Sequence, residues 1–270
     1  MTNQILFDKL GISVTVNRAA FSLFGIPIYW YGILIVSGIV IGVLYGLHEC
    51  KKTGIRQDDL LNLLLLSVPV GIVCARAYYV IFSWDSFRND LPSILNIRSG
   101  GLAIYGGIIG VCVVILVYCR RKKISVGKVL DILAVGLLIG QAIGRWGNFV
   151  NGEAFGGPTT LPWAMTVIQD GVRIANGVHP TFLYESLWNL AGIGVLLLYK
   201  KYFRKFYGEL FCTYLIWYGL GRAWIEGLRA DSLYIGAFRV SQILAVVCVL
   251  AGVCILIVGR KKAKTVKGSR

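Results

Sequence analysis

The sequence predicts an all-α polytopic membrane protein with seven transmembrane helices and a small extracytoplasmic head. Two observations carry this prediction. The composition is too apolar for a water-soluble domain, since 56 % of the 270 residues are hydrophobic, 15 % are charged and the mean hydropathy is +0.70. Soluble domains are roughly half apolar and a quarter charged. In addition, the apolar residues fall into seven long runs.

Each run is bounded by charged or turn-forming residues and is about 20 residues long, which is what a helix needs to cross a hydrocarbon core of ~30 Å. The expected spans cover residues 27–47, 60–83, 102–119, 129–150, 181–199, 209–228 and 238–258. We expect the whole chain, 1–270, to form a single integral membrane domain. We find no internal repeat, which disfavours a transporter built from inverted halves.

Positive charge is distributed unevenly between the two expected sides of the membrane. Eighteen of the 28 Lys and Arg residues follow the first, third, fifth and seventh spans. The positive-inside rule therefore puts the N-terminus outside the cell and the C-terminus in the cytoplasm. The net charge of +15 is then mainly an orientation signal, and we expect no nucleic-acid partner. The eighteen residues are Lys51, Lys52, Arg56, Arg120, Arg121, Lys122, Lys123, Lys128, Lys200, Lys201, Arg204, Lys205, Arg260, Lys261, Lys262, Lys264, Lys267 and Arg270.

The longest connections lie on the expected extracytoplasmic side. They cover residues 84–101 and 151–180, and the second of them is the expected head. Within it the stretch WAMTVI, residues 163–168, alternates in the way typical of a strand. Residues 1–26 also alternate in places and carry charge, which favours an interfacial arm over a targeting segment.

The metal-ligating residue types are scattered. The seven Cys residues form no CxxC pair, and the two His residues lie in no Cys/His cluster. Asp131 is the one aspartate inside an expected span, and Asp58 and Asp59 belong to a cytoplasmic connection. We therefore expect no metal and no other cofactor. An alcohol phosphatidyltransferase, which would need clustered aspartates for a divalent metal, is disfavoured on the same ground.

Ionisable side chains lie inside the expected spans, where each costs about 2.5 to 3.5 kcal/mol on insertion scales. These residues are Arg76, Arg145, Glu185, Arg222 and Glu226. Most belong to the outer half of their spans, which predicts one polar chamber near the outer leaflet. For Arg76, Glu185 and Glu226, pairing that only locks the bundle is an equally good interpretation.

Arg145 and Arg222 are the candidates for binding an anionic phosphate. Tyr218, Arg222 and Glu226 recur at intervals of four residues and so share one helix face. Arg145 belongs to GRWGNFVNGE, residues 144–153, which adds neutral amides and small residues at a helix end. Because a guanidinium offers a planar fork of donors and keeps its proton, two such groups beside amides suit a phosphate.

The stretch GRWGNFVNGE resembles the signature of the prolipoprotein diacylglyceryl transferase family. The resemblance covers most of the chain and implies seven spans with an outside N-terminus. Five further blocks agree in order and spacing: IYWYG (28–32), GGLAIYGG (100–107), HPTFLYE (179–185), YGLGRAWIEGLR (218–229) and SQIL (241–244).

The resemblance implies that the sn-1,2-diacylglyceryl group of phosphatidylglycerol is transferred to the thiol of a lipobox cysteine in a prolipoprotein signal peptide. A thioether forms and glycerol phosphate leaves, in the first step of bacterial lipoprotein biosynthesis. The implied location is the bacterial plasma membrane, with the active site towards the extracytoplasmic side and membrane lipids as neighbours. The nucleophile is the substrate's thiolate, so no cysteine of this chain needs to react.

The resemblance also implies roles for individual residues. The implied catalytic residues are Arg145, Arg222, Tyr105 and Glu153, with Arg145 binding the lipid phosphate and Arg222 acting as a second clamp. Glu153 would orient an arginine or the glycerol hydroxyls. The implied substrate-binding residues are Arg145, Tyr31, Asn148 and Asn151 around the headgroup, Tyr218 and Glu226 supporting Arg222, and Gly152 and Arg76.

One position departs from the family pattern. Many members carry a histidine, read as the base that takes the thiol proton, where this chain has Tyr105. A phenol is a poorer base than an imidazole at neutral pH. We therefore expect proton removal to be shared among Tyr105, solvent and the field of the arginines.

A seven-span transporter or receptor for anions or lipids, using the same arginine chamber, is the alternative from another functional class. It accounts for the buried charge. It does not account for the particular order of Asn, Glu and Tyr in the outer halves of the spans, and it predicts no chemical change in a lipid.

Overall fold

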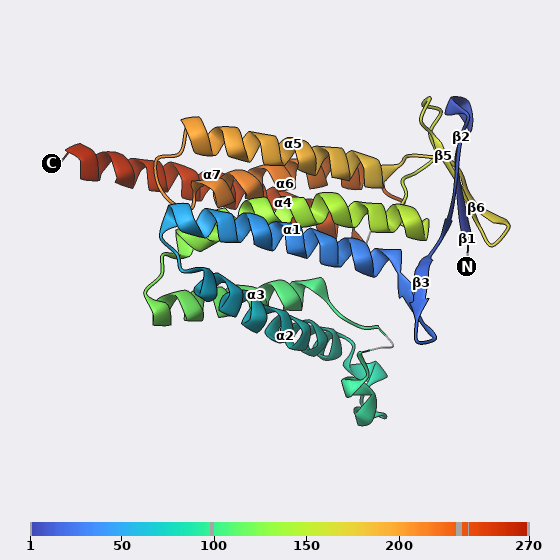
Figure 1. The fold of residues 1–270 in the computed structure, drawn as a ribbon, viewed down its shortest axis with the longest axis horizontal. Helices are drawn as coiled ribbons and strands as arrows, with labels where there is room; N and C mark the ends of the chain where they lie inside the picture. Colours follow the sequence, from blue (N-terminus) through green and yellow to red (C-terminus); the bar gives the residue numbers. More distant parts are fainter. Residues whose placement is uncertain (1, 98–99, 231–233, 237, 269–270) are drawn as a thin grey trace. The chain divides into compact units, whose positions relative to one another are not determined.

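The computed structural model describes residues 2–97, 100–230, 234–236 and 238–268 (Figure 1). Arg270, one of the residues in the charge asymmetry, lies outside them. The chain divides into two compact units. The larger unit comprises the residues up to Tyr45 and those from Leu130 onward, and the smaller unit is Gly46–Val129.

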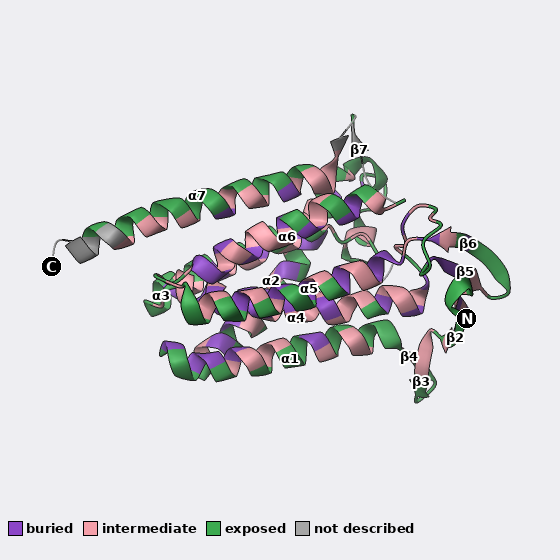
Figure 2. Ribbon diagram, turned by 90° about the horizontal axis from the view of Figure 1, so that it is seen from above, coloured by how far each residue is buried: buried purple, intermediate pink, exposed green. Residues whose placement is uncertain are grey.

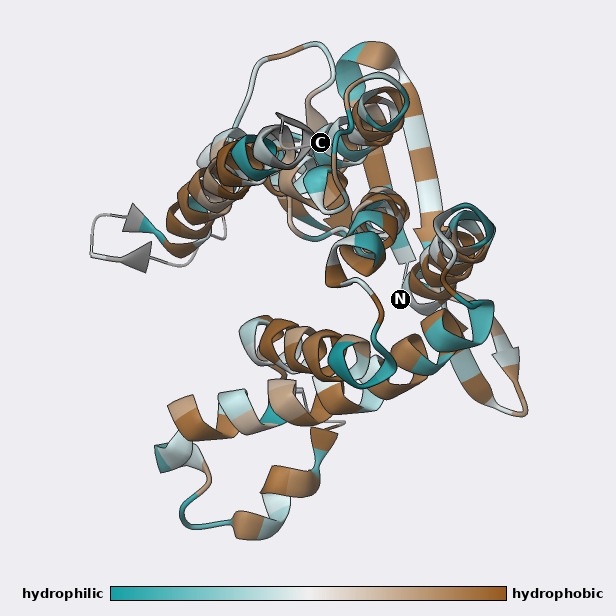
Figure 3. Ribbon diagram, turned by 90° about the vertical axis from the view of Figure 1, so that its left-hand side faces the viewer, coloured by the Kyte–Doolittle hydropathy of each residue, from teal (hydrophilic) through white to brown (hydrophobic). Residues whose placement is uncertain are grey.

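Seven long helices in the described residues follow the seven apolar runs. Several extend past the expected bounds at their Lys- and Arg-rich ends, because these side chains favour helix and reach away from the apolar region. Figure 3 shows hydrophobic residues along the helices. The helices are α1 Trp30–Thr53, α2 Gln57–Phe82, α3 Ile104–Lys122, α4 Val126–Asn151, α5 Thr181–Tyr202, α6 Glu209–Leu228 and α7 Val240–Gly268.

The composition and length of the helices define a polytopic membrane protein. Among the described residues, six helices are long and apolar enough to cross a membrane: α1 to α5 and α7. The remaining long helix, α6, spans 20 residues but includes Arg222 and Glu226. These two side chains lower its hydropathy, and they also belong to the candidate active site described below.

The core of the larger unit lies among α4, α5 and α6. Its buried residues include Ala134, Leu138, Leu196, Leu210 and Tyr214. Figure 2 shows α1 and α7 as more exposed helices, in keeping with positions beside lipid. Small residues bring α1 against α4, since a Cβ at Gly38 would lie 3.2 Å from Gly140 Cα.

A four-stranded antiparallel sheet with the strand order β2-β1-β5-β6 lies at one end of the helices of the larger unit (Figure 1). Its strands are β1 Thr2–Phe7, β2 Ile12–Asn17, β5 Met165–Gln169 and β6 Val172–Val178. β5 confirms the strand predicted at 163–168. The sheet joins the N-terminal arm to residues of the expected head, and Ile5 of β1 pairs with both Val14 and Val167.

The strands are a departure from the all-α fold. The sequence signal was the alternation in both segments, but alternation does not say which strand pairs with which. Pairing between residues more than 150 positions apart satisfies backbone groups that no helix accounts for. A hairpin of β3 Ala19–Leu23 and β4 Ile26–Tyr29 then leads into α1, and a short pair, β7 Tyr234–Ile235 and β8 Phe238–Arg239, precedes α7.

Two buried carboxylates at the far end of α4 and α6 have structural partners. Asp131 accepts hydrogen bonds from the backbone N–H groups of Gly208 and Phe211, at 2.9 and 3.1 Å. It thereby satisfies donors at the start of α6 that have no partner within the helix. Glu209 is fully buried, and its carboxylate accepts a hydrogen bond from Arg260 Nε at 2.9 Å. These contacts fix where α6 begins relative to α4 and α7.

Candidate active site

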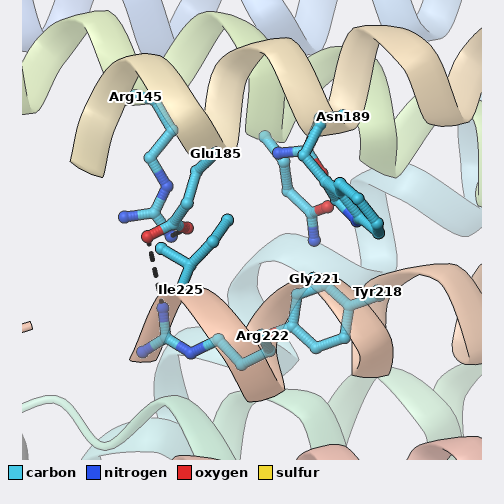
Figure 4. Close-up of a pocket in the computed structure, with 9 residues that line it drawn as sticks. Arg145, Glu185, Asn189, Tyr218, Gly221, Arg222 and Ile225 are labelled. Carbon is cyan, nitrogen blue, oxygen red and sulfur yellow. Dashed lines mark hydrogen bonds and ion pairs between the residues drawn. The ribbon is translucent and has the colours of Figure 1, made fainter. Parts of the chain in front are cut away.

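Three arginines surround two buried carboxylates inside the larger unit. Glu185, in the second turn of α5, has Oε2 at 2.6 Å from Arg145 Nη2 and Oε1 at 3.5 Å from Arg222 Nη1. Arg229 Nη1 lies 3.6 Å from the same Oε1. Figure 4 shows the Arg145 and Arg222 side chains reaching towards the Glu185 carboxylate from different helices. Glu226 Oε2 lies 2.7 Å from Arg222 Nη2, as an ion pair rather than an aligned hydrogen bond.

We refer to Arg145, Glu185, Arg222, Glu226 and Arg229 as the arginine–glutamate cluster. The Glu226 side chain is 2 % exposed and that of Glu185 is 10 % exposed, so neither carboxylate is well solvated. The cluster contains three guanidiniums and two carboxylates. Guanidiniums in a poorly solvated site favour binding of an anion, because the anion would replace the solvation that burial removes.

Paired tryptophans hold α5 against α6 close to the cluster. The indoles of Trp188 and Trp217 stack with ring centroids 4.4 Å apart. Each indole N–H donates to the other residue's backbone carbonyl, at 3.0 Å in both directions. Gly192 makes room for this arrangement, since a Cβ there would lie 2.5 Å from Trp217 Nε1. Trp188 follows Glu185 by about one turn of α5. The stack therefore fixes the position of Glu185 along the helix axis, opposite Arg222 on α6.

A second lock holds α4 against α5. Trp146 Nε1 donates to Ser186 Oγ at 3.2 Å, and Ser186 Oγ donates to the Ala142 carbonyl at 2.9 Å. Trp146 adjoins Arg145 in sequence, and Ser186 adjoins Glu185. The two hydrogen bonds therefore position the helices at the level where Arg145 and Glu185 form their ion pair.

The cluster lines a narrow pocket. Its lining includes Arg145, Glu185 and Arg222 together with Gln141, Asn189, Tyr218 and others on α4, α5 and α6. The cavity volume is about 20 Å³, enough for about one water molecule but not for a phospholipid headgroup. A phosphate that binds these arginines must therefore take over contacts that Glu185 and Glu226 now make.

A chain of hydrogen bonds leads from the cluster to the end of α4. Arg145 Nη1 donates to Asn148 Oδ1 at 3.4 Å. The Glu153 carboxylate accepts from Asn148 Nδ2 and from Asn151 Nδ2, each at 3.1 Å and on Oε1. The amides therefore connect Arg145 to Glu153, and the second oxygen of Glu153 has no donor among the described residues.

The four-stranded sheet caps the end of α4 that carries these residues. Asn3 Nδ2 on β1 donates to the Val150 carbonyl at 2.7 Å, and Gln169 Nε2 on β5 donates to the carbonyls of Asn151 and Gly152 at 3.0 and 3.1 Å. These carbonyls have no helical partner. Gly152 adopts φ +64°, and a Cβ there would lie 2.9 Å from Val167 Cγ1. Gly152 follows the last residue of α4, and its left-handed backbone conformation ends the helix.

Tyr31, at the start of α1, packs on the backbone of α4. A Cβ at Gly147 would lie 2.5 Å from Tyr31 Cδ2, so this glycine allows the ring to approach. Tyr31 also lines a groove of about 560 Å³ with Asn151 and Glu153. Two of the headgroup-binding residues implied by the resemblance, Tyr31 and Asn151, therefore meet at one groove together with Glu153. The hydrogen bonds from Arg145 through Asn148 to Glu153 link this groove to the arginine–glutamate cluster.

The loop after α4 reaches the ends of α5 and α6. Gly156 N–H donates to the His179 carbonyl at 2.9 Å, and Gly157 N–H donates to the Leu228 carbonyl at 2.7 Å. His179 and Leu228 directly flank the beginning of α5 and the position of Arg229. The loop that follows the block 144–153 is thus hydrogen-bonded to residues of the blocks 179–185 and 218–229.

Two predicted site residues, Arg76 and Tyr105, belong to the smaller unit. Arg76 donates five hydrogen bonds to backbone carbonyls at 2.8 to 3.2 Å, which uses all five of its donors. The acceptors lie between residues 93 and 101, so Arg76 organises the connection between α2 and α3. Tyr105 lies in the first turn of α3, with its ring centroid 6.4 Å from that of Tyr78.

The other nine predicted residues gather in the larger unit, in the cluster and its narrow pocket, the amide chain, the α4 exit and the groove. Two residues at the centre of the cluster were missing from the predicted site. The sequence marked Glu185 only as a buried charge, and Arg229 only as the last residue of the block 218–229. The signal that points to both is the presence of ionisable residues in or next to an apolar helix, which should each have a partner.

The fold and the site define a polytopic membrane protein whose larger unit contains a buried cluster of arginines and glutamates among its helices. The family model described as prolipoprotein diacylglyceryl transferase matches residues 18–258. The chain belongs to this family.

Curated relatives agree over nearly their whole length. A protein of Clostridioides difficile named phosphatidylglycerol–prolipoprotein diacylglyceryl transferase is 46 % identical over 248 residues, covering 92 % of this chain and 97 % of the relative. Relatives with the same name from Finegoldia magna and Bacillus cytotoxicus are 48 % and 43 % identical, covering 91 % and 96 % of this chain and 97 % of each relative.

Proposed function

We propose that this chain transfers the sn-1,2-diacylglyceryl group of phosphatidylglycerol to the lipobox cysteine of prolipoproteins, and that the arginine–glutamate cluster binds the phosphate that leaves. The family and the names of its relatives support the reaction and both substrates. This reaction is the first step of bacterial lipoprotein maturation.

In this reaction a carbon–sulfur bond forms and a carbon–oxygen bond breaks. The thiolate of the prolipoprotein attacks the carbon of the acylated glycerol that carries the phosphodiester. The phosphate oxygen takes the electron pair of the broken carbon–oxygen bond. Glycerol phosphate leaves with an additional negative charge. Arg145 and Arg222 would stabilise that growing charge, which is the interaction that lowers the barrier in such a step.

The remaining polar residues have complementary tasks in the proposal. Glu153 accepts hydrogen bonds from the glycerol hydroxyls of the headgroup with its second oxygen, while Asn148 and Asn151 hold its first. Tyr31 closes the other side of the groove. Glu185 and Glu226 keep the guanidiniums oriented until the phosphate replaces some of their contacts.

The thiol must lose a proton before it attacks. We propose that Tyr105, solvent and the positive field of the arginines share this task. Arg76, whose donors are all used by backbone carbonyls, acts in the proposal by holding the connection before α3 rather than by a direct contact.

The proposed topology has seven spans in the bacterial plasma membrane, with α6 as the span that carries the polar site. The N-terminus and the sheet are extracytoplasmic, and the Lys- and Arg-rich helix ends face the cytoplasm. This arrangement can be tested by cysteine labelling in spheroplasts. Cys254 and the other native cysteines are first replaced by serine, and single cysteines introduced at the helix ends are then labelled with maleimide reagents from either side of the membrane.

The single observation that carries the proposal is the hydrogen-bonded connection from Arg145 through Asn148 to Glu153 within the family signature. The test is an assay with purified protein, phosphatidylglycerol and a lipobox peptide, read by mass spectrometry. The expected result is a peptide heavier by one diacylglyceryl group together with released glycerol phosphate. A peptide with serine in place of the lipobox cysteine should stay unmodified.

An unmodified cysteine peptide, under conditions in which the Clostridioides difficile relative modifies it, would contradict the proposed function. If the protein instead moved intact phosphatidylglycerol or another anion across a vesicle membrane, the transporter alternative would be favoured.

A further inference from the structure

The groove beside the signature contains an arginine, Arg18, that has no part in the proposed reaction. The groove has a volume of about 560 Å³. We call it the Arg18 groove. It is lined by Arg18, Pro27, Ile28, Tyr29, Tyr31, Gly32, Ile33, Asn151 and Glu153.

The guanidinium of Arg18 is incompletely satisfied. Its Nε is buried from solvent and has no hydrogen-bond partner among the described residues. No carboxylate among those residues forms an ion pair with it. The backbone of Arg18 is nevertheless fixed, because its carbonyl accepts a hydrogen bond from Trp30 N–H at 3.1 Å. A buried donor without a partner is costly, and a ligand with acceptor oxygens would remove that cost.

The groove lies at the level where lipid headgroups are expected. α1, a candidate membrane span, begins at Trp30. Tyr29, Trp30 and Tyr31 form an aromatic group of the kind that marks the membrane–water interface. The adjoining hairpin exposes apolar side chains at its turn, with Phe24 96 % exposed and Ile26 65 % exposed. These apolar residues favour a lipid over a soluble ion as the occupant.

The polar groups of the groove match one headgroup chemistry. Arg18 offers donors to a phosphodiester, and Glu153 offers a carboxylate oxygen to a hydroxyl donor. A headgroup with an anionic phosphate and neighbouring hydroxyls satisfies both, whereas a trimethylammonium headgroup has no hydroxyl for Glu153. The apolar walls formed by Pro27, Ile28 and Ile33 then suit the glycerol backbone and the first part of the acyl chains.

We propose that the Arg18 groove is a docking site for phosphatidylglycerol, in which Arg18 binds the phosphate before the lipid reaches the arginine–glutamate cluster. The inference rests on the proposed function for the identity of the lipid. Glu153 belongs both to the groove and to the hydrogen-bonded chain that leads to Arg145, so a headgroup in the groove is already connected to the cluster. Arg18 acts as a specificity and docking residue and does not contact the reacting atoms.

The test compares Arg18→Gln, Arg18→Lys and Arg173→Gln in the full-length protein. Arg173 is an exposed residue of β6 outside the groove and serves as the matched control. Transfer to a lipobox peptide is measured while the mole fraction of phosphatidylglycerol in mixed micelles is varied. Arg18→Gln should raise KM for the lipid roughly tenfold, the size of one charge-assisted hydrogen bond, with little change in kcat. Arg18→Lys should have a KM for the lipid close to that of the unchanged protein, and Arg173→Gln should have the same KM and kcat as the unchanged protein.

A binding measurement separates this inference from the proposed reaction. Retention of phosphatidylglycerol and of phosphatidylcholine by the purified variants is measured by native mass spectrometry, with soluble glycerol phosphate as a competitor. Arg18→Gln should lose phosphatidylglycerol selectively. Unchanged lipid retention and unchanged KM in folded Arg18→Gln would overturn the inference. It would also be overturned if Arg18→Gln lost binding of glycerol phosphate but kept its retention of phosphatidylglycerol. If the unchanged protein transferred no lipid, the proposed function would fail while the retention assay still decided the docking site.

Discussion

Arg145 Nη2 lies 2.6 Å from Glu185 Oε2, and the other oxygen of the same carboxylate faces Arg222 and Arg229. One glutamate thus holds side chains from the ends of α4 and α6 in a common orientation. In the proposed reaction a phosphate competes with this carboxylate for the guanidiniums. The cluster is therefore organised before the lipid arrives, which lowers the reorganisation needed in the transition state.

Replacement of Glu185 should strongly destabilise the protein. Glu185→Gln leaves Arg145, Arg222 and Arg229 with less compensating charge in a buried site, and breaking such a network typically costs about 3 to 5 kcal/mol. Thermal unfolding in detergent is the measurement. Asp85→Asn is the control, because Asp85 forms an exposed pair with Arg88 and should leave the unfolding temperature nearly unchanged. Equal unfolding temperatures for the two variants would show that the network does not stabilise the fold.

Arginine geometry should matter in addition to charge. Arg145→Lys and Arg222→Lys keep a positive charge but lose the planar fork of donors. We expect each to lower kcat by roughly 100-fold, the loss typical of removing one charge-stabilising donor from a transition state. Release of glycerol phosphate is the readout, and Arg173→Lys provides the control. Full activity in both cluster variants would mean that the phosphate needs only a diffuse positive field there.

Tyr105→Phe tests the shared removal of the thiol proton. We expect a partial loss of turnover, much smaller than that of Arg145→Ala. The loss should shrink as pH rises towards the pKa of a free cysteine thiol, about 8.5, because the substrate then needs no base. Tyr78→Phe, at the neighbouring ring, is the matched control. Full turnover of Tyr105→Phe at every pH would exclude the tyrosine as a base, and a loss independent of pH would indicate a structural role.

Arg76→Lys should loosen the connection between α2 and α3. Lysine cannot replace five guanidinium hydrogen bonds to the carbonyls between residues 93 and 101, so local opening should become easier by about 3 kcal/mol. Hydrogen exchange at residues 91–97 would report this change, with the exposed Arg88→Lys as control. Unchanged exchange combined with a raised KM for lipid would instead support the direct substrate contact that the resemblance implies for Arg76.

Two glycines on α4 make a matched pair. A Cβ at Gly147 would meet Tyr31 Cδ2 at 2.5 Å, whereas a Cβ at Gly140 would meet nothing within 4 Å. Gly147→Ala should therefore displace the Tyr31 ring, with an overpacking cost of roughly 1 to 3 kcal/mol and reduced transfer activity. Gly140→Ala should be neutral or slightly stabilising, because alanine favours helix. The account of Tyr31 would be wrong if both variants behaved alike in activity and unfolding temperature.

Much of the helical architecture could be predicted because bilayer thickness and apolar run length are directly linked. The range 209–228 predicted α6 at its observed bounds, although Arg222 and Glu226 make that helix less apolar than the others. The strands were harder to predict. β1 depends on β5, more than 150 residues away, and local alternation carries no information about such a partner.

The site was predicted best where a motif is continuous. GRWGNFVNGE placed Arg145, Asn148 and Glu153 on one hydrogen-bonded path. The central role of Glu185 could not be derived in the same way, because it depends on the approach of α4, α5 and α6. That approach is set by the Trp188–Trp217 stack, which spacing along one helix does not reveal. In the sequence Arg76 does not differ from the other buried charges, because its backbone carbonyl partners are apparent only in the structure.

In the proposed reaction, Arg145 and Arg222 bind the phosphate of phosphatidylglycerol. The most direct measurement is an experimental structure of the protein in phosphatidylglycerol nanodiscs. We expect phosphate oxygens within hydrogen-bond distance of both guanidiniums, with the Glu185 carboxylate displaced from at least one of them. A phosphate bound elsewhere in a transfer-competent complex, with the Arg145–Glu185 pair still at 2.6 Å, would contradict the account.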